Sequence, residues 1–403
     1  MISSRSGHDS MRMERPLKIG VDASCWRLLR GFGRHTRCLL RELLEIDRRN
    51  EYLFFVDSER TAAALPKRAT ARITGDARAS SASGTRALGT LARTAVAISK
   101  APLDIIFFPA IYSYVPVLSR AKKVVTLHDA TAETFPDLVL HNRMARILWR
   151  AKTAIARRQA DALIAVSAYA RDQLSDRFHI PKERVQVVGE APDPRFRVLP
   201  RPVVETETLR KTGFRAGDRA IVYVGGFSPH KNLDVLVDAF GRMTAQPQYR
   251  DVKLYLVGDY EGDRFFSCHD KIAAQVAAAN LGSRVVFTGF LPDDDLVVLL
   301  NLAEMLVLPS MNEGFGLPAV EAAACGCPVI ATAASPLPAL LGDAMRPVDP
   351  RMLDQLQAAM AEILSSEELR DRMGKAGVAA AARLSWATEA RRLLSILTQV
   401  AAR

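Results

Sequence analysis

The chain has 403 residues, a hydrophobic fraction of 49% and a formal net charge of +11. Its length exceeds what one ordinary hydrophobic core supports, so we expect a globular protein with two domains. No apolar run reaches the roughly 18 residues that cross a bilayer, and residues 1–15 lack the apolar segment of a signal peptide. We therefore expect a cytoplasmic protein whose residues 1–15 form a flexible N-terminus.

The cysteine content and the charge distribution indicate the redox state of the thiols and the kind of partner. The five cysteines are scattered, which is typical of reduced thiols and argues against a disulfide framework or a zinc site. Residues 1–198 carry a net charge of +14, whereas residues 199–403 carry −3. The basic half predicts an anionic partner, either a nucleic acid or an anionic membrane surface, unless coding bias alone enriched arginine. No interleaving of basic and aromatic residues supports nucleic-acid binding.

The first half predicts alternating strands and helices. A strand over residues 17–22 is followed by a loop that contains Gly31 and Gly33, and then by an amphipathic helix around residues 39–44. This order is the opening unit of a doubly wound sheet. We expect residues 60–99 to be partly helical, with a mobile portion near residues 80–84. Short apolar runs predict buried parallel strands at 52–56, 105–108, 124–127 and 162–166.

The second half repeats the pattern after a proline-rich stretch. Residues 192–202 predict an interdomain linker. Strands are expected at 220–224, 253–257, 284–287, 305–308 and 328–332. We therefore expect two Rossmann-like domains, 16–198 and 199–384, that face a cleft, and a helix in 385–403 that packs back toward the first domain. Ligands of such sheets bind beyond the C-terminal strand ends, so the cleft is the expected site.

The most specific motif follows the strand at 305–308. Pro318 is placed to open a helix, Glu313 precedes that helix, and Glu321 falls about one turn inside it. Backbone N–H groups at a helix start form an anion site, here those of Gly314, Phe315, Gly316 and Leu317. Since carboxylates accept hydrogen bonds from sugar hydroxyls, the motif predicts a site for a sugar joined to a phosphate. The alternative is a capped helix with two solvated acids.

Three weaker motifs also follow expected strands. Gly225 and Gly226 turn the chain toward Lys231, which would neutralise a diphosphate as a point charge. His128 directly follows the strand at 124–127, where a structural and a functional histidine are about equally expected. The absence of side chains at Gly31 and Gly33 would allow a ligand to approach the backbone.

These motifs resemble, in type and order, the retaining glycosyltransferases of family 4, which have the GT-B fold. The longest match runs from Pro309 to Ile330, and the segments around Lys231, His128 and Gly33 agree as well. The resemblance extends from about residue 17 to the C-terminal helix. It implies an α/β protein that transfers a hexose, with mannose favoured, from a nucleotide-diphosphate sugar such as GDP-mannose to an acceptor hydroxyl in envelope polysaccharide or glycolipid synthesis.

The resemblance also implies a role for each motif residue. Glu321 would bind the ribose, and Glu313 and His128 would contact the donor sugar. Lys231 and the amides of Gly316 and Leu317 would hold the diphosphate, which Gly33 would approach from the other domain. The base would stack near Phe290 and Leu291. The implied donor-binding set is Gly33, Gly226, His230, Lys231, Phe290, Leu291, Glu313, Gly314, Phe315, Gly316, Leu317 and Glu321, with His128, Glu313 and Lys231 as catalytic residues. The family needs no metal and no cofactor besides the donor.

His230 stands where the family usually has arginine, so one charge at the diphosphate would depend on pH, and phosphate affinity would fall as pH rises through the histidine pKa. Asp293, Asp294 and Asp295 stand at a helix start, where acids cap and favour the dipole, and do not indicate a metal motif.

The acceptor is expected on the basic first half. Residues 143–158 combine helical apolar spacing with six basic residues. This predicts either a sheet-packing helix with a solvated basic face, or a contact with anionic lipid at the inner membrane face, which would suit a lipid-linked acceptor. Two further alternatives are a catalytically weak or silent homologue and a Rossmann oxidoreductase, although the latter's third glycine is replaced by Thr36.

Overall fold

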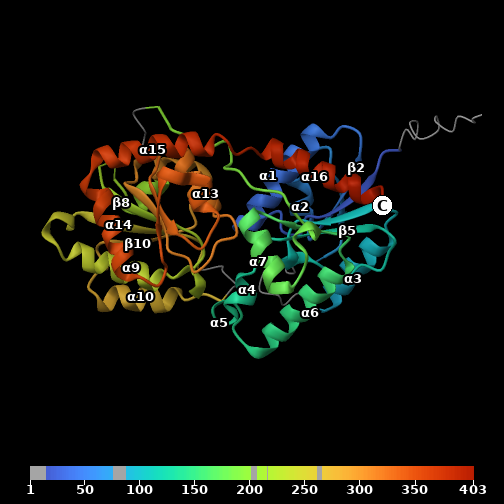
Figure 1. Cartoon of the computed structure of the whole chain (residues 1–403), viewed down its shortest axis with the longest axis horizontal. Helices are drawn as coiled ribbons and strands as arrows, with labels where there is room; N and C mark the ends of the chain where they lie inside the picture. Colours follow the sequence, from blue (N-terminus) through green and yellow to red (C-terminus); the bar gives the residue numbers. More distant parts are fainter. Residues whose placement is uncertain (1–14, 76–87, 201–206, 216, 261–265) are drawn as a thin grey trace, which may run out of the picture.

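The computed structural model describes residues 15–75, 88–200, 207–215, 217–260 and 266–403. These residues form two lobes, each built around a parallel sheet with helices on its faces (Figure 1). Most of the flexible N-terminus expected from the sequence, the mobile portion expected near residues 80–84, and residues 201 and 202 of the expected linker lie outside the described residues. No helix among the residues described is both long and apolar enough to cross a membrane.

The first lobe contains a seven-stranded sheet in the order β3-β2-β1-β4-β5-β6-β7, with every neighbouring pair parallel. Its strands are β1 Lys18–Asp22, β2 Glu51–Val56, β3 Thr70–Ile73, β4 Ile105–Phe108, β5 Lys122–Leu127, β6 Ala162–Ala165 and β7 Val185–Val187. Its helices are α1 Gly31–Ile46, α2 Glu59–Ala63, α3 Leu88–Lys100, α4 Thr131–Thr134, α5 Pro136–Val139, α6 Arg143–Gln159 and α7 Ala168–Phe178. The central strands are continuous apolar runs because helices cover both sheet faces.

The second lobe contains a six-stranded parallel sheet in the order β10-β9-β8-β11-β12-β13. Its strands are β8 Arg219–Val224, β9 Val252–Val257, β10 Val285–Gly289, β11 Met305–Leu308, β12 Val329–Thr332 and β13 Met345–Val348. Its helices are α8 Glu207–Lys211, α9 Leu233–Thr244, α10 His269–Ala278, α11 Asp293–Leu302, α12 Leu317–Ala324, α13 Leu337–Leu341, α14 Leu353–Ser365 and α15 Glu367–Ala381.

The last helix, α16 Trp386–Ala401, leaves the second lobe and packs against α1 of the first. Figure 1 shows it as the red helix that runs across to the side of the first lobe. Ser385 begins this helix by accepting a hydrogen bond from the Thr388 amide through its side chain. The chain therefore passes between the lobes twice, before α8 and before α16.

All ten strands expected from the sequence are present, and three more occur at sheet edges: β3, β7 and β13. One expectation about the first lobe is wrong. Gly31 and Gly33 do not lie in a loop, because α1 already begins at Gly31. Residues 31–34 therefore form the first turn of α1. This turn lies at the C-terminal edge of the first sheet, because α1 is the first helix after β1.

Candidate functional site

The motif with the two glutamates has the expected strand–turn–helix geometry. Gly316 caps α12 with a left-handed φ of 90°, a conformation that glycine adopts without strain. Pro318 lies in the first turn, and Glu321 is 3% exposed one turn along. No described residue accepts a hydrogen bond from the backbone N–H of Gly316 or Leu317. These two amides therefore remain available to an anion at the helix start.

Glu313 and Lys231 form an ion pair within the second lobe. Lys231 ends a short 3-10 turn, Pro229–Lys231, that follows β8, and its Nζ lies 2.7 Å from Glu313 Oε1. Ser310 donates a second hydrogen bond to the same oxygen at 2.6 Å. The Asn232 side-chain amide donates to Pro309 O at 3.1 Å and so joins the two loops. The carboxylate predicted to bind the sugar and the amine predicted to bind the diphosphate are thus neighbours.

The loop that carries Glu313 also contacts the first lobe. Ser167 Oγ, at the start of α7, donates to Gly314 O at 2.7 Å. A Cβ atom on Gly314 would lie 2.4 Å from His128 O, so only glycine fits at this position. Asn312 accepts from Tyr169 OH at 3.1 Å and from Gln173 Nε2 at 2.9 Å. The C-terminal strand edges of the two sheets therefore meet at residues 312–314.

His128 belongs to a buried cluster with His35 and Glu190. The His128 Nε2 atom lies 2.9 Å from Pro109 O. His35 Nδ1 lies 2.9 Å from Glu190 Oε1, although the two atoms are not aligned for a hydrogen bond. Burial lowers the pKa of His128 to about 4 and that of His35 to about 3, and it raises the pKa of Glu190 to about 8. Near neutral pH His128 is therefore an uncharged hydrogen-bonding group.

The same cluster is the one group of described residues whose spacing could hold a metal ion, since its ligand atoms lie within 4.8 Å of one another. No sequence motif assigned a role to Glu190 or His35. No local pattern could have revealed them, because β5, α1 and the segment after β7 bring the three residues together only in the folded lobe.

Glu321 is paired with a side chain from the opposite lobe. Arg34 Nη1, on α1, lies 2.5 Å from Glu321 Oε1, and Arg34 also pairs with Asp293 at the start of α11. Asp293 accepts a further hydrogen bond from Arg195 at 2.6 Å. Asp293 lies in the first turn of α11, as expected, but it makes no side-chain capping bond, and its carboxylate binds two arginines instead.

Gly33 and Gly226, two glycines of the implied donor-binding set, have different surroundings. A Cβ atom on Gly33 would lie 2.1 Å from Leu28 O, so the local turn already requires glycine there. A Cβ atom on Gly226 would lie 3.3 Å from the guanidinium of Arg30, which caps α1. Arg30 thus places a cation from the first lobe beside the predicted diphosphate loop. Sequence reasoning missed this residue, because its partner lies almost 200 positions further along the chain.

His230 does not supply the charge expected from the sequence. Burial, with help from Lys231 and Arg30, lowers its pKa to about 3, and the turn that carries it packs against α5 of the first lobe. The expectation of a charge that varies near neutral pH is therefore wrong for the donor-free protein. His230 is instead part of the contact between the lobes.

The two residues predicted to lie near the base differ in accessibility. Phe290 is 44% exposed directly after β10, whereas Leu291 is 2% exposed. Only the Phe290 ring could therefore present a face to a base without rearrangement.

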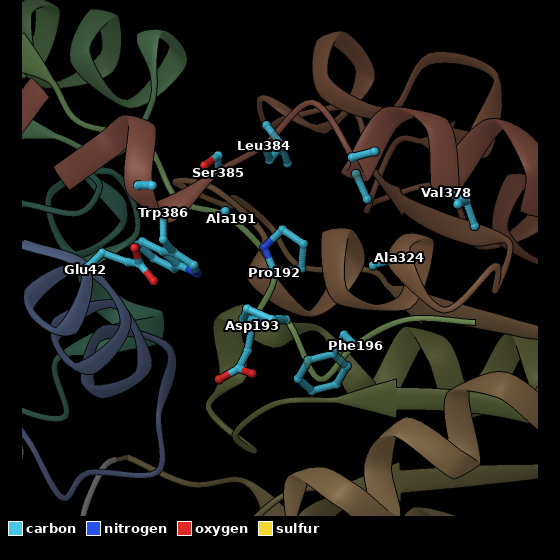
Figure 2. A pocket seen from close by; sticks show the side chains of 14 residues that line it. Glu42, Ala191, Pro192, Asp193, Phe196, Ala324, Val378, Leu384, Ser385 and Trp386 are labelled. Atoms are coloured by element: carbon cyan, nitrogen blue, oxygen red, sulfur yellow. The ribbon is translucent and has the colours of Figure 1, made fainter. Parts of the chain in front are cut away.

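A cavity of about 360 Å³ lies where the linker passes between the lobes. Figure 2 shows residues 191–196 running between Glu42 and Trp386 on one side and Ala324 and Val378 on the other. Phe196 from this linker lies beneath the Arg34 guanidinium, 5.0 Å from its Cζ. The cavity therefore adjoins the Arg34 network at one of the two places where the chain passes between the lobes.

Comparison with protein families matches both lobes. The family model described as "Glycosyltransferase Family 4" matches residues 29–195, and the one described as "Glycosyl transferases group 1" matches residues 204–379. The second match contains Lys231, Glu313 and Glu321, and the first contains Arg34 and His128. The two matches together cover most of the chain.

Comparison with individual proteins points the same way. The serotype-specific mannosyltransferase WbdA of Escherichia coli is 29% identical over 273 residues, 67% of this chain and 32% of that protein, so the chain spans about a third of its length. The O-antigen chain mannosyltransferase B of E. coli is 28% identical, over 67% of this chain and 68% of that protein. HepE of Anabaena, solved in complex with UDP-glucose, has a TM-score of 0.72 at 19% identity and covers 95% of this chain and 100% of that one. This last likeness shows a shared fold, the GT-B arrangement of two Rossmann-like domains.

Proposed function

Since this chain belongs to the group 1 glycosyltransferases of the family 4 type, we propose that it is a retaining, metal-independent hexosyltransferase. It moves a hexose, with mannose favoured, from a nucleotide-diphosphate sugar to an acceptor hydroxyl. The observation that carries this proposal is the position of the Glu313–Lys231 pair beside the open start of α12. A sugar hydroxyl needs the carboxylate, and a diphosphate needs the amine and the helix amides.

We propose the following division of roles. The amides of Gly316 and Leu317, with Lys231, stabilise the charge that develops on the departing diphosphate. Glu313 holds hydroxyls of the donor sugar, and uncharged His128 contacts the sugar from the first lobe. The acceptor oxygen attacks the anomeric carbon on the face that the diphosphate leaves. Its proton passes to the departing phosphate oxygen, so no side chain is required as a nucleophile. Closure of the two lobes excludes water and limits hydrolysis.

Mannose and polysaccharide synthesis are favoured by the relatives. WbdA and the O-antigen chain mannosyltransferase B are named mannosyltransferases, and the match to the latter covers 68% of its length. HepE binds UDP-glucose with the same fold at lower identity, which keeps a UDP-sugar as the second candidate donor. A catalytically weak homologue remains the alternative, because His230 supplies no charge where the family usually has arginine.

A test of the reaction uses a reporter of nucleoside diphosphate release with GDP-mannose and UDP-glucose, followed by NMR of the product's anomeric proton. The proposal expects an α-linked product from an α-linked donor, and the same rate in the presence of EDTA. A β-linked product would contradict retention, and complete loss of activity in EDTA would contradict metal independence. Donor binding without turnover on any acceptor would favour the catalytically weak alternative.

We further propose that α6 contacts an anionic membrane surface, where a lipid-linked acceptor would be presented. Three of its large apolar residues face away from the core: Met144, Ile147 and Leu148 are 61%, 59% and 58% exposed. The buried side of the helix is formed by Thr153 and Ala156 instead. An exposed apolar stripe flanked by arginines suits the interface of an anionic leaflet at the cytoplasmic face.

Sedimentation with vesicles tests this contact. The wild type should bind vesicles that contain anionic phosphatidylglycerol, and salt should weaken the binding because part of it is electrostatic. Ile147→Asp should abolish binding and leave the melting temperature unchanged, because the side chain is exposed. Leu118→Asp is the matched control, since Leu118 is an 85% exposed apolar residue outside α6. Equal binding to neutral vesicles, or no binding, would contradict the contact.

A further inference from the structure

The side chain of Arg34 crosses from the first lobe into the second. Its Nη1 lies 2.5 Å from Glu321 Oε1, and the two side chains are only 14% and 4% exposed. The pair is therefore almost removed from water, where a hydrogen bond between opposite charges is strong. The Phe196 ring, 5.0 Å from the Arg34 Cζ, restrains the guanidinium on its other side. Arg34 is thus held in one position by groups from the linker and from the second lobe.

The contact uses only one oxygen of the carboxylate. Arg34 donates to Oε1, and no described residue donates a hydrogen bond to Oε2. Oε2 is not among the fully buried polar atoms that lack a partner, so it keeps some contact with solvent. A hydroxyl group could therefore donate to Oε2 while Arg34 remains bound to Oε1.

We propose that Arg34 is a positioning residue for the donor: it fixes the orientation and the charge of Glu321 from the opposite lobe. The ribose subsite is then complete only when the lobes are closed. Arg34 couples donor binding to closure in this way, because opening the cleft withdraws the guanidinium from the carboxylate. This inference rests on the proposed function, since it takes Glu321 as the ribose ligand.

The electrostatics of the pocket give the coupling a measurable signature. Burial raises the pKa of Glu321 to about 7, although Arg34 acts to lower it. Without Arg34 the pKa would rise further, and the carboxyl would be largely protonated at neutral pH. The other titratable and charged groups around it are Asp293, Asp193, Arg195, Cys38 and Cys325. Burial raises the pKa of both thiols to about 12, so they stay uncharged in the relevant range.

The experiment is calorimetric titration of the full chain with GDP-mannose, or with UDP-glucose if that donor binds, between pH 6 and pH 9. Arg34→Gln should bind the donor about 10- to 100-fold more weakly at pH 7. The affinity of this variant should recover as pH rises, and the pH of half-recovery should lie about 1 to 3 units above that of the wild type. Arg34→Lys should restore part of the affinity and should bring the pH of half-recovery back toward the wild-type value. Arg41→Gln, an exposed substitution on the same helix, is the matched control and should match the wild type.

The pKa values of Glu190 and Glu133 are raised to about 8 and 7, so these groups titrate in the same pH range as Glu321. The role of Arg34 is therefore judged from the difference in pH dependence between the wild type and Arg34→Gln, and not from either curve alone. Glu321→Gln should weaken binding at every pH. In a protein that already carries Glu321→Gln, adding Arg34→Gln should weaken binding no further. If Arg34→Gln binds as tightly as the wild type, or is weakened by the same factor at every pH, the positioning role is overturned. If the wild type itself binds no nucleotide sugar, the proposed function fails. Failure of the positioning role alone is recognised because the wild type still binds the donor.

Discussion

The backbone of Gly314 lies directly against that of His128, although the two residues belong to different lobes. A Cβ atom on Gly314 would stand 2.4 Å from His128 O and 2.9 Å from the Asp129 Cβ. Neither neighbour is the end of a flexible side chain. The approach of the two strand edges therefore depends on the absence of a side chain at residue 314.

Gly314→Ala should hold the lobes apart and impair the reaction. We expect kcat/KM to fall about 100-fold, the loss that a displacement of about 1 Å at a reacting centre produces. The melting temperature should fall little, because each lobe keeps its own core. Gly282→Ala is the matched control, since nothing lies within 4 Å of a Cβ atom at that position. Wild-type kinetics in Gly314→Ala would show that this close contact is not needed for the reaction.

Lys231→Met should weaken donor binding and also lower stability. A hydrogen bond to a charged group contributes about 1.5 to 3 kcal/mol, so we expect about a 10- to 100-fold rise in the dissociation constant. The Lys231 and Glu313 side chains are only 23% and 12% exposed, so loss of the amine leaves a largely buried carboxylate without its counter-ion, and the melting temperature should fall as well. Calorimetry measures the affinity, and Lys271→Met on α10 controls for loss of a lysine. An unchanged affinity would remove Lys231 from the diphosphate site.

His35 should make the protein sensitive to acid. Burial lowers its pKa from 6.5 to about 3, so the unfolded chain binds a proton that the folded protein excludes. The stability that the folded protein gains by keeping His35 neutral is fully present above pH 6.5 and is lost as pH falls toward 3. Between pH 6.5 and pH 5 this one group lowers the free energy of unfolding by about 2 kcal/mol. Glu190, with its raised pKa, acts in the opposite direction, so the comparison must be made between variants.

Urea denaturation at pH 6.5 and pH 5 measures that difference. His35→Gln should lose about 2 kcal/mol less than the wild type over this interval. His141→Gln, on an exposed loop, controls for the removal of an imidazole. Parallel losses in the wild type and His35→Gln would show that His35 is protonated in the folded protein.

The sequence predicted the elements whose residues carry their own signal. Strands such as β4 and β11 are four consecutive buried residues, and the start of α12 is marked by Gly316 and Pro318. Three of the four edge strands were missed: β3 is exposed along its whole length, β7 has only three residues, and β13 contains Pro347. Buried apolar runs are therefore predicted well, whereas short edge strands give little pattern.

The contacts between the lobes could not be predicted from the sequence. Arg34 and Glu321 are 287 residues apart, and nothing within either segment specifies the other as a partner. The same holds for Arg30 beside Gly226 and for His230 against α5. The sequence suggested which residues face the cleft, and the relative placement of the two sheets determines which of them pair. The donor-binding roles themselves stay predictions until a donor is bound.

The most direct measurement is a thermal shift of the wild type and Glu321→Gln against a panel of nucleotide sugars, with NAD and NADP included. A ligand at 100 times its dissociation constant stabilises the folded protein by about 2.7 kcal/mol. We predict that at least one nucleotide sugar raises the melting temperature of the wild type, that Glu321→Gln loses most of this shift, and that NAD and NADP have no effect. A shift with NAD or NADP and with no nucleotide sugar would contradict the account.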